Sequence, residues 1–193
     1  MKVTRKGFTL VELLIVIVVI GILSAMMMLS STESVSSAKA SNIISNLRNM
    51  KTATLAWYTD NLDSVVRDAN GVYTITIDGQ KGKTMSDLVK DHSDEILKYL
   101  NNDKSITLQS RTALTAGNYS VVAMVNSSKW YVCYFVNSSE TRVKEKLAAR
   151  AKSIGLLGST KFALGADGGK QSSLSEEYKD QEIVCMPVLS LED

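Results

Sequence analysis

The sequence feature that most constrains this chain is an apolar stretch close to the amino terminus. It covers the 22 residues from Phe8 to Leu29, and Glu12 is the only charged residue among them. As a helix with a rise of about 1.5 Å per residue, this stretch is roughly 30 Å long, which matches the thickness of a bilayer core. Lys2, Arg5 and Lys6 precede it, and basic flanks stay on the cytoplasmic side of a membrane. The sequence therefore predicts one membrane-spanning helix, with the rest of the chain facing outward.

The start of the apolar stretch carries a specific pattern. A carboxylate inside a membrane helix costs about 2.5–3.5 kcal/mol on insertion scales, so Glu12 is expected to need a partner. The sequence at this point reads Gly7-Phe8-Thr9-Leu10-Val11-Glu12. With its short basic leader and unbroken apolar run, this arrangement resembles the type IV prepilin signal of the type IV pilin family. The resemblance covers only about the first 30 residues.

This resemblance implies how the chain is processed. A membrane prepilin peptidase would cut between Gly7 and Phe8 on the cytoplasmic side, and the new amino terminus of Phe8 would be methylated. The mature chain would keep 186 of the 193 residues. Glu12 would neutralise the amino group of Phe8 on a neighbouring subunit during polymerisation. Many relatives carry a proline where this chain has Leu29, so unwinding of the helix near Gly21, known from some assembled pili, is left open.

An ordinary secretory signal and a plain membrane anchor both fit the stretch less well. A secretory signal is cut after its apolar run, behind small residues, whereas a cut after Ala25 would have the large Leu23 three places before it. Such a signal also has apolar side chains where this chain has Glu12. A plain single-pass anchor requires neither Glu12 nor the Gly7–Phe8 junction.

The helix is predicted to continue beyond the membrane. No proline or glycine interrupts residues 30–37, and apolar side chains then recur at spacings of three and four, which is typical of one face of a helix. These are Ala40, Ile43, Ile44, Leu47, Met50, Trp57 and Tyr58. We therefore expect one helix over about residues 9–60, roughly 80 Å long. Its outer half must bury that apolar face, and the following domain is the expected partner.

The remaining chain alternates strand and helix patterns. β-branched and alternating residues predict strands over 72–77, 119–125, 130–136 and 182–189. A helix is predicted over 84–100, with Thr84 as its cap and Asp87 completing a capping-box-like pattern. A second helix is predicted over 139–154. Residues 60–67 are interpreted as a loop and turn, and residues 155–175 as loop-rich.

Two strands carry further expectations. Tyr131, Cys133 and Phe135 alternate with bulky neighbours, so both faces of their strand are apolar and the strand should be central. The long helix would cover one of its faces. Pro187 cannot donate a ladder hydrogen bond, so the last strand should lie at an edge or contain a bulge there.

The cysteines and the few candidate ligands limit the chemistry. Cys133 and Cys185 fall on the outward side, where the compartment can oxidise them, so one disulfide is expected; two buried free thiols are the alternative. The single histidine, His92, lies on an apolar stripe and is interpreted as a core-edge residue. Residues 165–169 hold too little for a calcium or phosphate site. No metal, cofactor or catalytic constellation is expected, which argues against an enzyme.

Positive charge concentrates on the predicted helix over residues 139–154. Its basic side chains are interpreted as a solvated face, with contact to DNA or a substratum as the alternative. They are Arg142, Lys144, Lys146, Arg150 and Lys152. The formal net charge of the whole chain is +2, which gives no indication of nucleic-acid binding by itself.

Together these patterns predict an α+β fold with a long amino-terminal helix packed on an antiparallel sheet of about four strands, as in pilins. The expected parts are a leader (1–7), a membrane and polymerisation half of the helix (8–29), an amphipathic half (30–60) and a head (61–193). The expected function is that of a structural subunit of a type IV pilus. The chain would be held in the bacterial membrane as a prepilin, in contact with lipid and the pilus assembly machinery. It would then be polymerised into an extracellular homo-oligomeric filament for adhesion, motility or biofilm. The alternative is a pseudopilin of a type II secretion system.

Overall fold

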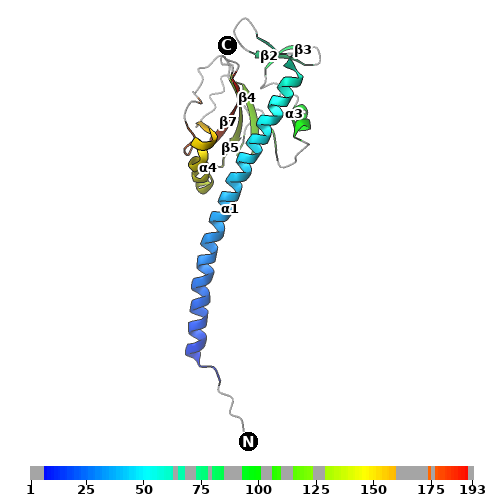
Figure 1. Ribbon diagram of the computed structural model, residues 1–193. Helices are drawn as coiled ribbons and strands as arrows, with labels where there is room; N and C mark the ends of the chain where they lie inside the picture. The colour runs from blue at the N-terminus through cyan, green and yellow to red at the C-terminus, as the bar shows by residue number, and fades with distance from the viewer. Residues whose placement is uncertain are drawn as a thin grey trace.

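The computed structural model describes residues 7–62, 65–67, 73–77, 80–84, 93–100, 106–109, 115–123, 129–159, 174 and 177–190. One long helix, α1 (Leu10–Asp60), runs through the molecule, and a head of strands and shorter helices is gathered around its carboxyl-terminal part (Figure 1). The predicted α+β class is confirmed. So is the long amino-terminal helix packed on an antiparallel four-stranded sheet.

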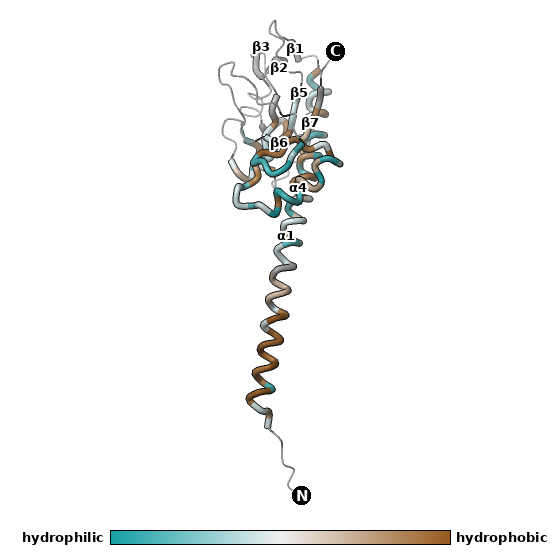
Figure 2. Tube along the Cα trace, turned by 90° about the vertical axis from the view of Figure 1, so that its left-hand side faces the viewer, coloured by the Kyte–Doolittle hydropathy of each residue, from teal (hydrophilic) through white to brown (hydrophobic). Residues whose placement is uncertain are grey.

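Helix α1 is continuous over 51 residues and begins where the sequence predicts. Thr9 caps its first turn, and at the other end the backbone N–H of Asn61 donates to the carbonyl oxygens of Trp57 and Tyr58. The helix is long and apolar enough to cross a membrane, judged by length and composition. Figure 2 shows its first half as almost uniformly hydrophobic and the half inside the head as mixed.

Burial divides α1 into two halves. In the exposed half (residues 10–35) every described side chain is exposed, whereas in the packed half (residues 36–60) one face enters the core. The predicted apolar face is confirmed: Ala40, Ile43, Ile44, Leu47, Met50 and Trp57 are buried. Tyr58 packs beside them, with its ring edge-on to Trp130 at a centroid distance of 5.1 Å. The long helix therefore acts as part of the core of the head over about half of its length.

The main sheet has four antiparallel strands in the order β4-β5-β7-β6. The strands are β4 (Tyr119–Ala123), β5 (Lys129–Phe135), β6 (Leu157–Ser159) and β7 (Ile183–Ser190). Strand β5 lies between β4 and β7, so the prediction of a central strand is confirmed. Trp130, Val132 and Tyr134 belong to the core beside α1, while Tyr131 and Cys133 pack on the opposite face.

The ladder between β5 and β7 shifts its register beside the only proline. Trp130 pairs with Leu189, but Tyr131 pairs with Pro187, so Val188 is skipped. On the other side of β7, strand β6 pairs with residues 183–185 and stops short of Pro187. Pro187 lacks the N–H that a continuous ladder would use, and the predicted irregularity at this position is confirmed.

Strand β6 corrects the interpretation of residues 155–175 as a loop. It pairs with β7 over three residues, one of which is Gly158. A Cβ atom at Gly158 would come within 2.2 Å of Oε1 of Gln181, so the side chain of Gln181 occupies that space. A three-residue strand with a central glycine has no alternating pattern to reveal it.

A second, three-stranded sheet also departs from the prediction. Its strands are β1 (Val65–Arg67), β2 (Tyr73–Ile77) and β3 (Gln80–Thr84), in that order and antiparallel. The strand predicted over 72–77 is confirmed as β2, but residues 60–67 do not form only a loop. Thr84, the predicted helix cap, is the last residue of β3. Asp87 and His92 lie outside the described residues.

The described part of the head also contains two shorter helices. Helix α3 (Ser93–Tyr99) covers the end of the helix predicted over 84–100, and Ile96 and Leu100 are buried as expected. Helix α4 (Thr141–Ile154) buries Val143, Leu147 and Ala151, and it ends at Gly155 with φ +75°. That left-handed conformation is costly for residues with a Cβ atom and is the usual reason for glycine at a helix end.

Candidate processing and assembly site

The segment that precedes α1 is accessible and extended. Phe8 is 86% exposed, Gly7 is exposed, and Thr9 has φ −82° and ψ 151°. A Cβ atom at Gly7 would meet no described atom within 4 Å. Any requirement for glycine at this position is therefore imposed by a partner molecule and not by the described part of the fold.

Thr9 and Glu12 close the first turn of α1 with a reciprocal capping box. The Thr9 hydroxyl oxygen accepts from the backbone N–H of Glu12 at 3.3 Å, and Oε2 of Glu12 accepts from the Thr9 backbone N–H at 2.8 Å. The Thr9 hydroxyl also donates to Oε2 at 2.8 Å. These bonds satisfy backbone donors that a helix start leaves without partners. Thr9-x-x-Glu12 has capping-box spacing, so the sequence carries a signal for this cap, but the cap was not among the predictions.

This capping box changes what Glu12 needs. Its carboxylate accepts from two donors of Thr9, and both are neutral, so among the described residues no cation pairs with its negative charge. Among the described residues, Oε1 of Glu12 accepts no bond. The partner expected for Glu12 is therefore specifically a cation.

Up to Met28, the exposed half of α1 presents apolar side chains on all sides of the helix. Leu13, Ile17 and Ile20 are each more than half exposed, and so are most of their apolar neighbours up to Met28. A helix that is hydrophobic on every face is stable only inside a membrane or inside an assembly. The described parts of the head do not cover this surface (Figures 1 and 2).

Helix α4 is joined to α1 by a set of polar contacts, which we call the α1–α4 contact. Lys39 forms an ion pair with Glu140, and Nζ of Lys146 lies 2.8 Å from Oε1 of Glu33. Arg142 donates to Thr32 at 2.5 Å, and Arg150 donates to Ser41 at 2.7 Å. Lys146 holds the pKa of Glu33 below its ordinary value, chiefly through their hydrogen bond. Arg142 stays exposed, as the predicted solvated basic face requires. Arg142, Lys146 and Arg150 nevertheless each bond α1, and these contacts were not predicted.

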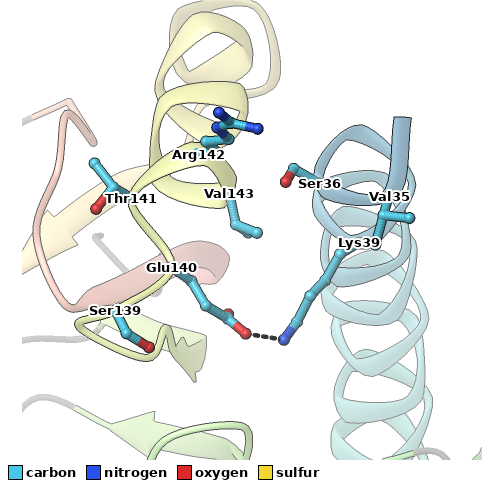
Figure 3. Close-up of a pocket in the computed structure, with 8 residues that line it drawn as sticks. All are labelled: Val35, Ser36, Lys39, Ser139, Glu140, Thr141, Arg142 and Val143. Carbon is cyan, nitrogen blue, oxygen red and sulfur yellow. Dashed lines mark hydrogen bonds and ion pairs between the residues drawn. The ribbon is translucent and has the colours of Figure 1, made fainter. Parts of the chain in front are cut away.

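A groove of about 560 Å³ lies between the two helices at this contact (Figure 3). Its lining is mixed, with Val35 and Val143 beside the charged Lys39, Glu140 and Arg142. Oε1 of Glu140 is paired with Lys39, but its buried Oε2 has no hydrogen-bond partner among the described residues. No three His, Cys, Asp or Glu side chains in the described parts of the chain gather as a metal site would require.

Cys133 and Cys185 form a disulfide between β5 and β7. They are direct partners in the ladder, and both are fully buried on the sheet face away from α1. This bond holds the last strand of the chain to the centre of the sheet.

Comparison with known proteins identifies the amino-terminal segment. Residues 3–28 match the prokaryotic N-terminal methylation motif, which is the type IV prepilin leader signature. Comparisons with curated proteins and with solved structures gave no match. The motif supports a type IV pilin or pseudopilin-like prepilin, a class that is structural and not enzymatic. It implies processing by a peptidase and assembly into pilus-like polymers, and together with the apolar helix it fits a membrane-anchored precursor.

Proposed function

We propose that this chain is the structural subunit of a type IV pilus, made as a membrane-anchored prepilin and polymerised into an extracellular filament. The observation that carries the proposal is the exposed half of α1: up to Met28 it is almost entirely apolar, it lies within the segment that matches the leader signature, and it is continuous with a folded head. Lipid would cover this half in the precursor, and the corresponding halves of other subunits would cover it in the filament. The chain itself would catalyse no reaction.

In this proposal the leader is removed between Gly7 and Phe8, and the new amino group of Phe8 is methylated. The cut converts the amide nitrogen of Phe8 into an amine, one residue before the Thr9 N–H that Glu12 already binds. The carboxylate of Glu12 is then held at the start of the helix, where an incoming amine of a neighbouring subunit supplies the missing cation. Pairing removes two uncompensated charges from an apolar environment, which favours subunits added in one register.

Mass spectrometry of the mature chain tests the processing step. We expect Phe8 as the first residue, carrying one additional methyl group on its nitrogen. Gly7→Val should block the cut, because the peptidase needs close access to the backbone, while Gly21→Ala serves as a matched control that is processed normally. A mature chain that starts at any other residue refutes this step.

Filament yield tests the assembly step, and the capping box allows charge to be separated from helix capping. Glu12→Ala removes the negative charge and the cap together. Glu12→Gln keeps the capping geometry without the charge, and Thr9→Val keeps the charge without the cap. We expect both Glu12 variants to be processed but to build few filaments, and Thr9→Val to build many. If Glu12→Gln assembles like wild type, Glu12 acts as a cap and the pairing is refuted.

A pseudopilin would share the processing step and differ in its product. Imaging cells with and without this gene distinguishes the two, because loss of long surface filaments indicates a pilus subunit. Unchanged filaments together with a loss of secreted proteins would instead indicate a pseudopilin of a type II secretion system.

A further inference from the structure

The membrane-facing end of the head carries a concentration of positive charge. Figure 1 shows α4 at the end of the head from which α1 leaves. Helix α4 carries five cationic side chains and one acidic side chain, Glu145. Glu33 of α1 pairs with Lys146 and also interacts electrostatically with Arg142. The cations of α4 still outnumber these carboxylates, so this end of the head has an excess of positive charge among the described residues.

The α1–α4 contact fixes the depth of two of these cations relative to a membrane. The apolar stretch ends at Leu29, and Glu33 follows four residues later, about 6 Å along a helix. A bilayer of about 40–45 Å with a hydrocarbon core of about 30 Å has a headgroup layer of roughly 5–8 Å on each side. Arg142 bonds Thr32 and Lys146 bonds Glu33, so both cations lie at the height of the headgroup layer.

From this geometry we propose that α4 is a docking surface for the headgroups of anionic phospholipids in the same membrane that holds α1. The proposal rests on the proposed function, because it requires α1 to be inserted in a membrane. Arg142 is exposed and Lys144 and Lys146 are half-buried. The adjoining groove of about 350 Å³ is lined by Arg142 and Lys146 but also by Glu33 and Glu145, so its lining has no net positive charge, and the docking rests on the excess charge of α4 as a whole. Docking would hold the head against the membrane surface before assembly and would be released when the subunit is extracted.

Headgroup quenching in nanodiscs tests the proposal. The full chain is placed at one copy per disc, with a fluorophore on Thr141→Cys, an exposed position at the start of α4. Both native cysteines are disulfide-bonded and do not react. A nitroxide on a fixed fraction of zwitterionic headgroups is the quencher. We expect at least about twofold more quenching in discs that contain phosphatidylglycerol than in pure phosphatidylcholine, with the difference lost in about 0.5 M salt, on the order of the screening known for basic surface segments.

Two triple variants make the test specific. Arg142→Gln/Lys144→Gln/Lys146→Gln should abolish the lipid-dependent quenching. Arg48→Gln/Lys51→Gln/Lys98→Gln removes the same charge higher on the head and should leave it intact. Glu33→Gln separates lipid binding from the helix contact: it removes a carboxylate from the surface and should keep or increase the quenching. A label on Thr59→Cys, at the far end of α1, should not be quenched in any disc.

Equal quenching of Thr141→Cys in both lipid compositions overturns this inference, and so does quenching that survives the first triple variant. Each variant is compared only when its disulfide is intact and its helix content is that of wild type. If alkaline extraction releases the chain from the discs, α1 is not inserted, and the proposed function fails first. If the chain stays inserted but α4 shows no lipid dependence, only the docking surface fails.

Discussion

The two halves of α1 form one uninterrupted helix but depend on different surroundings. In residues 36–60 one face is apolar and enters the core of the head, while the other face is polar and exposed. In residues 10–35 every described side chain is exposed, and up to Met28 these side chains are almost entirely apolar. The first arrangement is complete within one chain. The apolar surface of residues 10–28 must be covered by lipid or by other subunits, because exposing an apolar surface of this size to water is unfavourable.

The difference shows that folding and assembly use separate parts of one element. The packed half contacts β5 and β7 on one side of the sheet, so the head should fold whatever covers residues 10–35. In the proposed filament, Glu12 and the start of the helix would set the register between exposed halves. Substitutions on either side of this division should therefore affect either the stability of the head or the assembly of the chain, but not both.

The largest change in the free energy of unfolding is expected from loss of the disulfide, which lies on the sheet face that α1 does not cover. The disulfide closes a loop with a sequence separation of 52 residues between Cys133 and Cys185, and the loop-entropy estimate for this length is about 4 kcal/mol of stability. We expect Cys185→Ser to lower the free energy of unfolding by about that amount. In limited proteolysis, the first new cuts should fall between β6 and β7, while α1 stays protected.

Alkylation of the unfolded, unreduced protein supplies the control for this prediction. Wild-type protein should show no reactive thiol, and reductant should reproduce the effect of Cys185→Ser. Two labelled thiols per wild-type chain would contradict the disulfide. Simultaneous loss of protection in α1 and in the β6–β7 region would contradict the separation of the two faces.

The next prediction compares the stability effects of two substitutions, one in each half of α1. Leu47 is fully buried, and Leu47→Ala leaves a cavity in the core that costs about 2–5 kcal/mol. Ile17 is 57% exposed, so Ile17→Ala should leave the unfolding of the head unchanged. Denaturant unfolding of the full chain in detergent, followed by the fluorescence of Trp57 and Trp130, measures both. Equal destabilisation by the two substitutions would show that the halves fold as one unit.

Much of this division could be predicted from the sequence, for physical reasons that differ between the halves. The apolar run and the spacing of Ile43, Leu47 and Met50 depend only on helix periodicity, and the structure confirms that face as buried. The alternation around Cys133 likewise identified the two faces of β5. Strands β1 and β6 could not be recognised because each has only three residues, too few to show an alternating pattern. Strand β3 pairs with its neighbour β2, but its sequence Gln80-Lys81-Gly82-Lys83-Thr84 has no apolar residue to mark a buried face.

The polar parts of the candidate site were harder to predict than the apolar parts. The capping box is local, so Thr9 and Glu12 alone could have revealed it. The α1–α4 contact instead joins side chains about a hundred positions apart in the sequence, such as Lys146 and Glu33 with a separation of 113. In sequence, a basic helix face that contacts another helix looks the same as a basic face exposed to solvent. Only the tertiary fold shows which of its side chains have partners.

A smaller effect is expected where the two halves meet. Lys146 lowers the pKa of Glu33, so this ion pair contributes stability above the ordinary pKa of 4.5 and loses it as the pH falls through the lowered folded value. We expect the contact between Lys146 and Glu33 to open in this acidic range, while the buried Val143, Leu147 and Ala151 keep α4 in the core. Titration of Glu33 by NMR should show the low pKa, Lys146→Met should return it to its ordinary value, and Lys152→Met should leave it low. A Glu33 that titrates normally in the wild-type chain would contradict the contact.

The smallest effect is confined to the exposed half. A Cβ atom at Gly21 meets nothing within 4 Å, so Gly21→Ala introduces no clash with the described residues and removes a helix-weakening residue worth about 1 kcal/mol. Amide exchange near residue 21 in detergent should therefore slow about fivefold, which is about 1 kcal/mol as an equilibrium factor. Ala25→Gly is the matched reverse change, and it should speed exchange by a similar factor. Head unfolding should be unchanged in both variants.

If Gly21→Ala also reduces filament yield while processing is normal, the helix must open near Gly21 during assembly, and glycine there replaces the proline that Leu29 does not provide. A normal yield would instead show that α1 enters the filament as the continuous helix described here.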